Sequence, residues 1–285
     1  MQKAVRGKYT ITQNKEISPG IFEIRFDAPD ICGAAAGGQF VNVYLPGGSM
    51  LLPRPLGIAG SDGGLTLVYA VVGAGTEALS LIEEGERIEL MGPLGEGVFD
   101  YIGNTAKEIL LIGGGLGIPP LLFAAQKMKE ERGDVNLTAF LGYRSDPFYV
   151  QEFKSVCGEV HVASETEGAA GFCGNVIDLL DSAGAKGELA LDCGPRPMLA
   201  LACGPRPMLA AAAGWCAERD IPLRVSLEER MGCGYGACAG CTVETRFLGD
   251  EKRPQNGPYF PDGNGITRKK VCVHGPVFWA DEVVW

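Results

Sequence analysis

Short apolar runs alternate with turns over roughly the first hundred residues of the chain. Several runs place apolar and polar residues in strict alternation, which is the pattern of a half-buried strand. Strands are predicted over 9–12, 21–26, 39–45, 65–69 and 87–90. Strands at this spacing predict a small antiparallel barrel, with one helix over 75–82 that Thr76 caps.

The pattern changes near residue 107 to longer apolar runs separated by helical segments. Residues 108–112 are almost continuously apolar, as in a parallel strand buried on both faces. Strand and helix then alternate over 108–112, 120–132, 137–141, 150–156, 160–163, 176–181 and 188–191. This β-α-β-α order predicts a doubly wound parallel α/β domain that binds a nucleotide.

The C-terminal part of the chain holds four cysteines, little regular pattern and a polar, Gly/Pro-rich stretch over 248–267. A module of this kind cannot bury much core alone and needs a staple such as a metal cluster. We therefore predict an α+β multidomain protein. The expected divisions are 1–104 for the barrel, 105–222 for the α/β domain and 223–285 for the cysteine module.

One internal repeat is plain, because residues 191–200 are followed at once by a near copy over 201–210. Each copy contains the run Cys-Gly-Pro-Arg-Pro-Met-Leu-Ala. Two copies are too few for a solenoid, and a second pair of prolines cannot sit inside a continuing helix. We expect the first copy to end a strand and the second to start a helix, with an extra loop between them.

Composition narrows the classes of function. The 285 residues carry 25 basic and 35 acidic side chains, a net charge of −10, and no Lys/Arg run, which disfavours a nucleic-acid binder. No apolar run reaches the roughly 18 residues that span a bilayer, and the first residues lack a signal-peptide pattern. We expect a cytoplasmic protein whose ten cysteines are reduced. The two histidines, His161 and His274, exclude a histidine-rich metal site and leave few ways to form a Ser/His/Asp triad.

The strongest chemical motif is Cys233-x4-Cys238-x2-Cys241, with Cys272 downstream. This is the ligand spacing of a plant-type [2Fe–2S] cluster, and thiolates are soft ligands that suit iron–sulfur centres. The intervening glycines let the backbone wrap tightly and direct N–H groups at the sulfurs. The alternatives are four buried cysteines or a zinc site. Four other cysteines lie singly near apolar stretches and are expected in the core: Cys32, Cys157, Cys173 and Cys216.

A second motif places glycines between a buried strand and a helix. Gly113, Gly115 and Gly117 precede a pair of prolines in the order G-x-G-x-x-P. Glycines permit close approach of a pyrophosphate, and a helix N-terminus offers N–H groups to it. The alternative is a tight turn without a ligand. The strand expected next to this turn ends at Cys193, which has a copy in Cys203. We expect these cysteines at the ligand-binding edge of the sheet. The alternative is a buried thiol that merely precedes a turn.

A third motif lies in the predicted barrel. Arg54, Pro55, Leu56 and Gly57 form one segment, and Gly75-Thr76 follows at the start of the expected helix. The arginine fork suits a phosphate. Taken alone, the first segment could be a surface arginine and the second a helix cap. They indicate a ligand site only in combination with the other two motifs, through their order along the chain.

Together these motifs resemble those of the ferredoxin reductase-like flavoproteins. Two further segments, 226–233 with the run Ser-Leu-Glu-Glu-Arg-Met-Gly-Cys and 270–278, resemble the electron-transfer subunits of class B dihydroorotate dehydrogenases in particular. The resemblance implies FAD, a [2Fe–2S] cluster and NAD as cofactors. It implies a partner catalytic subunit that oxidises dihydroorotate at FMN in pyrimidine biosynthesis, and a heterotetramer of two of each chain. A subunit of a ferredoxin:NADP⁺ oxidoreductase or sulfhydrogenase complex is the alternative enzyme, and a cluster-containing sensor without hydride transfer is the third possibility.

The resemblance also implies roles for individual residues. The expected FAD-binding residues are Arg54, Pro55, Leu56, Gly57, Tyr69, Ala70, Val71, Gly75 and Thr76. Gly113, Gly115 and Gly117 would face NAD, and Cys193 or Cys203 would lie at the nicotinamide. The sequence departs from the family at Gly57, where the family usually has serine. It departs also in the 30 residues between Cys241 and Cys272, where we expect an inserted loop, and in the duplication.

Overall fold

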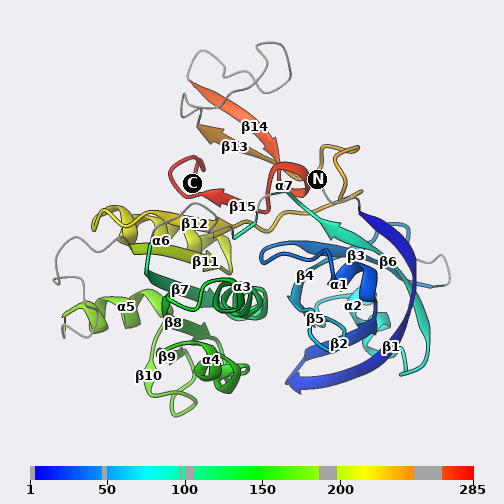
Figure 1. The fold of residues 1–285 in the computed structure, drawn as a ribbon, viewed down its shortest axis with the longest axis horizontal. Helices are drawn as coiled ribbons and strands as arrows, with labels where there is room; N and C mark the ends of the chain where they lie inside the picture. Colours follow the sequence, from blue (N-terminus) through cyan, green and yellow to red (C-terminus); the bar gives the residue numbers. More distant parts are fainter. Residues whose placement is uncertain (1–3, 47–49, 97, 100–105, 186–197, 247–264) are drawn as a thin grey trace.

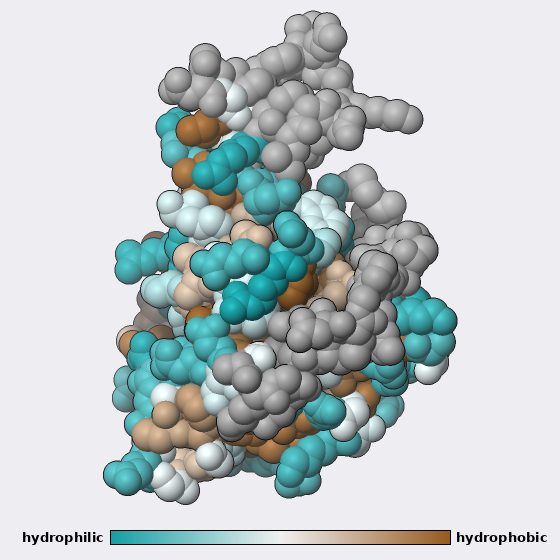
Figure 2. All heavy atoms as spheres, turned by 90° about the vertical axis from the view of Figure 1, so that its left-hand side faces the viewer, coloured by the Kyte–Doolittle hydropathy of each residue, from teal (hydrophilic) through white to brown (hydrophobic). Residues whose placement is uncertain are grey.

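A computed structural model describes residues 4–46, 50–96, 98–99, 106–185, 198–246 and 265–285. It forms a barrel, an α/β sheet and a small module that contacts both (Figure 1). On the face shown in Figure 2, hydrophilic residues surround smaller hydrophobic groups. No helix within the described ranges is long and apolar enough to cross a membrane.

The N-terminal part closes into the predicted antiparallel barrel, in the strand order β1-β2-β5-β4-β3-β6. The strands are β1 (Val5–Ser18), β2 (Ile21–Asp27), β3 (Phe40–Tyr44), β4 (Arg54–Gly60), β5 (Leu65–Ala70) and β6 (Arg87–Leu94). Two short helices accompany them, α1 (Pro29–Cys32) and α2 (Ala74–Ser80). Alternate residues such as Ile24 and Phe26 are fully buried inside the barrel, as the period-two pattern requires.

The second part is a seven-stranded sheet in the order β10-β9-β8-β7-β11-β12-β15. The strands are β7 (Glu108–Gly114), β8 (Asn136–Tyr143), β9 (Glu159–Ser164), β10 (Phe172–Cys173), β11 (Met198–Cys203), β12 (Leu223–Ser226) and β15 (Val277–Trp279). All neighbours are parallel except β12 and β15. Helices α3 (Ile118–Glu131) and α4 (Val150–Val156) share one hydrophobic core, and α5 (Val176–Ala185) and α6 (Arg206–Ala217) share the other. The sheet is therefore doubly wound, as predicted.

The third part is inserted between two strands of that sheet. It consists of the antiparallel pair β13 (Thr242–Arg246) and β14 (Ile266–Lys270), the short helix α7 (Val271–His274), and the loop Cys233–Cys241, called the cysteine loop below. Because β12 and β15 lie in the sheet although they follow residue 222, both ends of the cysteine module are anchored to the nucleotide domain (Figure 1).

The second copy of the repeat lies at the junction of a strand and a helix. Strand β11 runs from Met198 to Cys203, so the second copy both ends the strand and, from Arg206, starts helix α6. The predicted strand over 188–191 and the first copy's Cys193 lie outside the described residues. The expectation that the second copy starts a helix is confirmed, whereas the expectation that the first copy ends a strand concerns residues outside the described ranges.

Two physical reasons favour the second copy as the end of β11 and the start of α6. Aligning the first copy with the strand would place Asp192 where Ala202 now lies, at a position with no solvent exposure. An unpaired buried carboxylate is strongly unfavourable there. The helix that followed would also run into Gly204, Pro205 and Pro207, which cannot lie in a helix interior without breaking it.

Candidate functional site

The two halves of the predicted flavin motif meet on the barrel. Arg54 begins β4, and Gly75 and Thr76 lie in the first turn of α2. A Cβ atom on Gly75 would overlap the guanidinium of Arg54, so only glycine leaves room for that side chain. The Thr76 hydroxyl oxygen accepts a hydrogen bond from the Val72 N–H (2.9 Å), which fixes the turn. The Arg54 guanidinium, which suits a phosphate, and the glycine turn at the start of α2 thus lie next to each other on the barrel.

Residues Tyr69, Ala70 and Val71 lead from β5 toward this turn. The Tyr69 ring points into the barrel, where only 1% of the residue is exposed, and its hydroxyl donates to Asn14 Oδ1 (3.1 Å). The side chain of Tyr69 therefore cannot contact a ligand on the outside. Any contribution of this segment to a flavin site has to come from its backbone, as expected.

The glycine turn of the nucleotide domain lies beside the end of β11. Gly113 pairs with Cys203 in the sheet, and Gly115 has a φ of +52°. A Cβ on Gly117 would overlap the backbone carbonyl of Cys203. The structure thus brings the three predicted glycines and the second Cys-Gly-Pro copy to one edge of the sheet, where nucleotides bind in folds of this kind.

The Cys203 thiol is held in its neutral form. Burial raises its pKa to about 12, the nearby carboxylate of Glu228 adds to this rise, and a hydrogen bond with Ser226 opposes it. A thiol with such a pKa is not a nucleophile at neutral pH. Cys203 can therefore shape the site and contact a ligand, but it is not a reactive thiolate.

The barrel and the nucleotide turn touch at Gly57. Its Cβ position lies 2.9 Å from Cγ of Pro120, in the first turn of α3. The residue where the family usually has serine is therefore a contact point between the flavin strand β4 and the helix that follows the nucleotide loop. Leu56 and Pro55, the remaining residues of the predicted segment, lie in the same strand and pair with β3.

The four predicted ligands of the cluster form two pairs. The Cys233 and Cys238 thiols contact each other, and so do the Cys241 and Cys272 thiols. Within the described part of the chain, no three Cys, His, Asp or Glu side chains gather as the ligands of a single ion would. Two such pairs of thiols supply the two thiolates per iron that a two-iron cluster takes.

Backbone N–H groups of the cysteine loop point at these sulfurs. Ala237 N–H lies 3.2 Å from Cys233 Sγ, and Gly240 N–H lies 3.4 Å from Cys238 Sγ. Burial alone would raise the pKa of Cys233, but N–H donors, first among them that of Cys238, lower it to about 7. The loop achieves this wrap with positive φ at Gly234, Gly236 and Ala239. The donor set and the N–H groups fit an iron–sulfur cluster.

Two side chains that the sequence did not single out hold this loop by its carbonyl groups. Asn42 Nδ2 donates to the Cys233 carbonyl (2.8 Å) from strand β3 of the barrel. Lys270 Nζ donates to the Gly236 carbonyl (2.6 Å) from strand β14. Asn42 had one sequence signal, a polar residue inside the apolar run 40–43, but its partner lies 191 residues away.

A third unpredicted contact joins the barrel to the nucleotide domain. The Tyr149 hydroxyl, at the start of α4, donates a very short hydrogen bond to Glu23 of β2. Burial alone would raise the pKa of Glu23, but Tyr149, then Arg25 and Lys15, lower it overall. Burial and the Glu23 carboxylate together raise the pKa of Tyr149.

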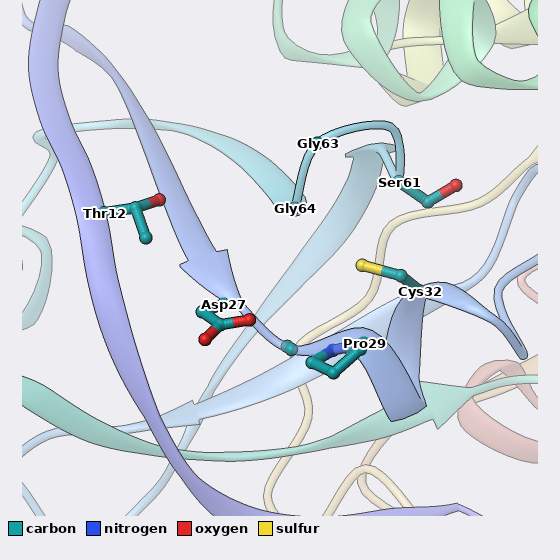
Figure 3. Close-up of a pocket in the computed structure, with 8 residues that line it drawn as sticks. Thr12, Asp27, Pro29, Cys32, Ser61, Gly63 and Gly64 are labelled. Atoms are coloured by element: carbon teal, nitrogen blue, oxygen red, sulfur yellow. The ribbon is translucent and has the colours of Figure 1, made fainter.

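A pocket of about 400 Å³ opens elsewhere on the barrel, between α1 and the turn that joins β4 to β5 (Figure 3). Asp27, Cys32 and Ser61 are among its lining residues. None of the predicted site residues lines it. Burial, together with the Asp30 carboxylate, raises the pKa of the Cys32 thiol, so this cysteine is not a reactive thiolate either.

Comparison with known proteins decides the family. Residues 228–264 match the family model for the iron–sulfur cluster binding domain of dihydroorotate dehydrogenase B. The dihydroorotate dehydrogenase B (NAD⁺) electron transfer subunit of Enterococcus faecalis is 36% identical over 96% of this chain and 97% of its own. That of Shouchella clausii is 32% identical over 98% of both. The chain belongs to the dihydroorotate dehydrogenase B electron transfer subunit family.

Solved structures agree with this membership. A chain of the NADH-dependent reduced ferredoxin-NADP oxidoreductase has a TM-score of 0.76 and 29% identity, covering 97% of this chain and 90% of that chain. A ferredoxin NADP⁺ reductase from Neisseria gonorrhoeae, solved with FAD and NADP, has a TM-score of 0.61 and 13% identity, over 75% of this chain and 91% of that one. The second similarity shows the fold only. The predicted family and fold class are both confirmed.

Proposed function

We propose that this chain carries electrons from a dihydroorotate-oxidising partner, through a [2Fe–2S] cluster and FAD, to NAD⁺. The observation that carries the proposal is the convergence of the three candidate sites. The loop of Cys233 is held by β3, β3 pairs with the flavin strand β4, and Gly57 of β4 touches Pro120 beside the nucleotide turn. Electron transfer falls steeply with distance, so carriers that exchange electrons need this closeness.

Each residue has a proposed task. Arg54 would bind the FAD phosphates beside Gly75 and Thr76, and the backbone of Gly113, Gly115 and Gly117 would approach the NAD phosphates. Cys203, as a neutral thiol, would pack against the nicotinamide, whereas we assign no role to Cys193. When bound, the cluster supplies one-electron steps and FAD couples them to a two-electron hydride transfer.

We further propose that the cysteine loop faces the partner. The relatives are named electron transfer subunits, which implies a catalytic subunit beside them. Cys238 is exposed, and Tyr235 between the first two cysteines is 55% exposed. We propose two copies of each chain in the complex, and a reducing, cytoplasmic compartment in which the four ligand thiols stay available. We keep the domain boundaries near residues 104 and 222 as our proposal. Strands β12 and β15 follow residue 222 in the chain but belong to the sheet of the nucleotide domain.

The main alternative is a subunit of a ferredoxin:NADP⁺ oxidoreductase complex, which the similarity to the NADH-dependent enzyme would allow. The relatives that match this chain over nearly all of its length favour dihydroorotate. Mixing the purified chain with a catalytic subunit of dihydroorotate dehydrogenase B discriminates the two. Dihydroorotate-dependent NADH formation supports the proposal, and NAD⁺ reduction by reduced ferredoxin alone supports the alternative.

An anaerobic NADH titration of the isolated chain tests the electron path. We expect both the flavin and the iron–sulfur absorbance bands to be present and to bleach as NADH is added. If dithionite bleaches both bands but NADH bleaches neither, the cofactors are bound and the nicotinamide site does not work. If the iron–sulfur band is missing from protein made under anaerobic, iron-replete conditions, the proposal is wrong.

A further inference from the structure

Asn42 is a polar side chain in a place where an apolar one would be expected. It lies in the middle of β3, between Val41 and Val43, and has no solvent exposure. Its neighbours across the two adjacent strands are Pro55 of β4 and Met91 of β6. Around it the barrel and the cysteine module share an apolar core, in which Phe40 and Leu94 pack with Cys241 and Cys272. A backbone hydrogen bond from the Glu96 N–H to the Val273 carbonyl (3.1 Å) joins the same two parts.

Only one end of the Asn42 amide is satisfied. Nδ2 donates to the Cys233 carbonyl, whereas Oδ1 is buried and accepts no hydrogen bond from any residue that the structure describes. A buried acceptor without a donor is unfavourable for stability. The amide thus satisfies the Cys233 carbonyl while leaving its own oxygen unsatisfied, so its net gain in stability is small and the contact calls for a further explanation.

The cysteine loop is shaped to meet this amide. Gly234 follows the first ligand with a φ of +75°, and a Cβ on it would overlap both polar atoms of Asn42. The close approach of the loop to the Asn42 side chain at this point thus requires the glycine. Lys270 holds the same loop at Gly236, but from within the cysteine module, so Asn42 is the contact that fixes the loop relative to the flavin strand.

We propose that Asn42 is a positioning residue for electron transfer between the cluster and the flavin. Its amide holds the Cys233 end of the cysteine loop against β3, one strand from Arg54–Gly57, and so sets the separation and relative orientation of the two carriers. The inference rests on the proposed function for the identity of those carriers. The rate of electron transfer falls steeply as the separation of the carriers grows, and the hydrogen bond prevents the loop from moving away from β3.

The test replaces Asn42 by leucine, which has a similar size and no polar atom. The control is Asn136→Leu at the start of β8, because the Asn136 amide donates to the Glu108 carboxylate (3.0 Å) within the nucleotide sheet, apart from the flavin motif and the cysteine loop. Flavin in the purified chain is reduced by photoreduction, which needs neither NADH nor a partner subunit. Transfer to the cluster is then followed in the visible spectrum, and the reduced cluster is examined by EPR.

We expect Asn42→Leu to keep its FAD and iron, to show a changed EPR signal, and to transfer electrons from flavin to cluster about tenfold more slowly or worse. Asn136→Leu should transfer at the wild-type rate with the wild-type EPR signal. An Asn42→Leu protein with wild-type transfer and an unchanged EPR signal would overturn the proposal. If that protein does not fold, Asn42→Thr is used, since its hydroxyl is too short to reach Cys233, and the same outcomes apply.

Failure of this inference is distinguishable from failure of the proposed function. Wild-type protein that transfers electrons from flavin to cluster but is not reduced by NADH contradicts the path to NAD⁺ and leaves the role of Asn42 intact. Wild-type behaviour of Asn42→Leu in photoreduction, with normal NADH reduction, contradicts only the role of Asn42.

Discussion

At the scale of single residues, the candidate sites depend on places where a side chain would not fit. Gly75 is such a place, since its missing Cβ leaves room for the Arg54 guanidinium, whereas Gly73 two residues earlier faces open space and has an extended backbone. The two glycines belong to the same turn and differ in what surrounds them.

This difference gives a matched pair of substitutions. Gly75→Ala should displace Arg54 and weaken FAD binding by about tenfold or more, because a charge-assisted contact with phosphate is lost. Gly73→Ala should leave FAD affinity within about twofold of the wild type. Titration of the apoprotein with FAD by fluorescence measures both. Equal affinities of the two variants would contradict the placement of the flavin phosphates beside Arg54.

The Tyr149–Glu23 hydrogen bond has a defined pH window. The pKa of Glu23 is lowered, so its contribution to stability is present above about pH 4.5 and is lost as the pH falls through the lowered value. The pKa of Tyr149 is raised, so its contribution is present below about pH 10 and is lost as the pH rises further.

Tyr149→Phe should therefore lower the unfolding free energy by about 1.5–3 kcal/mol near pH 7. The difference from the wild type should shrink both below about pH 4.5 and above about pH 10, as the two groups titrate. Urea unfolding monitored across this range tests the prediction. Tyr143→Phe is the control, because the Tyr143 hydroxyl donates to the Phe148 carbonyl and not to a carboxylate, so its effect should not follow the titration of Glu23.

At the scale of elements, the repeat shows what local pattern can and cannot predict. Period-two alternation predicted the barrel, and the apolar run 108–112 followed by glycines predicted β7 and its turn. The two copies of the repeat share their glycine and proline pattern and differ at one position, Asp192 against Ala202, so turn and helix signals alone do not select between them. The choice is made by Ala202, which packs between β7 and β12 at a depth where Asp192 could not be accommodated.

Two deletions of equal length test this explanation. Removal of residues 192–201 joins Leu191 to Ala202 and keeps alanine at the buried position, whereas removal of 193–202 joins Asp192 to Cys203. Both leave a single Cys-Gly-Pro copy. The first protein should keep its melting temperature within a few degrees of the wild type, because a shorter connection between α5 and β11 changes the closure entropy little. The second should lose several kcal/mol through the buried carboxylate. Similar melting temperatures would show that burial does not select the copy.

The contacts that the sequence could not predict share one property. Asn42 and Cys233 are 191 residues apart, and Glu23 and Tyr149 are 126 residues apart. Hydrophobic periodicity reports which face of an element is buried, but it does not report which other element covers that face. The motifs therefore predicted the ligands of each site, and the side chains that hold the sites together emerged only from the fold.

At the scale of the whole molecule, the C-terminal segment connects the cysteine module to the nucleotide sheet. Lys269 of β14 forms an ion pair with Glu282 (2.8 Å), and both side chains are largely buried. Beside this pair, the hydroxyls of Thr245 and Thr267 contact each other at 2.8 Å in the interior. Buried polar contacts thus join the C-terminal segment to β14 and β14 to β13 within the cysteine module.

Removing one partner of the ion pair should lower the stability of the protein much more than replacing both partners by apolar residues. Glu282→Ala removes the carboxylate that the buried Lys269 ammonium faces and should cost about 3–5 kcal/mol, whereas Lys269→Met combined with Glu282→Leu should be nearly neutral. Thermal unfolding, with iron content per chain as a second readout, measures both proteins. A double variant as unstable as the single one would mean that Lys269 and Glu282 matter through contacts other than with each other.

The four cysteines also differ in how deeply they lie. Cys241 and Cys272 are buried, Cys238 is exposed, and Cys233 is intermediate, so one pair of thiols faces the outside and the other faces the core. The side by which electrons can enter is then also the side by which oxygen and chelators can attack. A partner that docks over the outer pair of thiols would deliver electrons there and would also shield the pair from oxygen and chelators. The isolated subunit should therefore lose its metal sooner than the assembled complex.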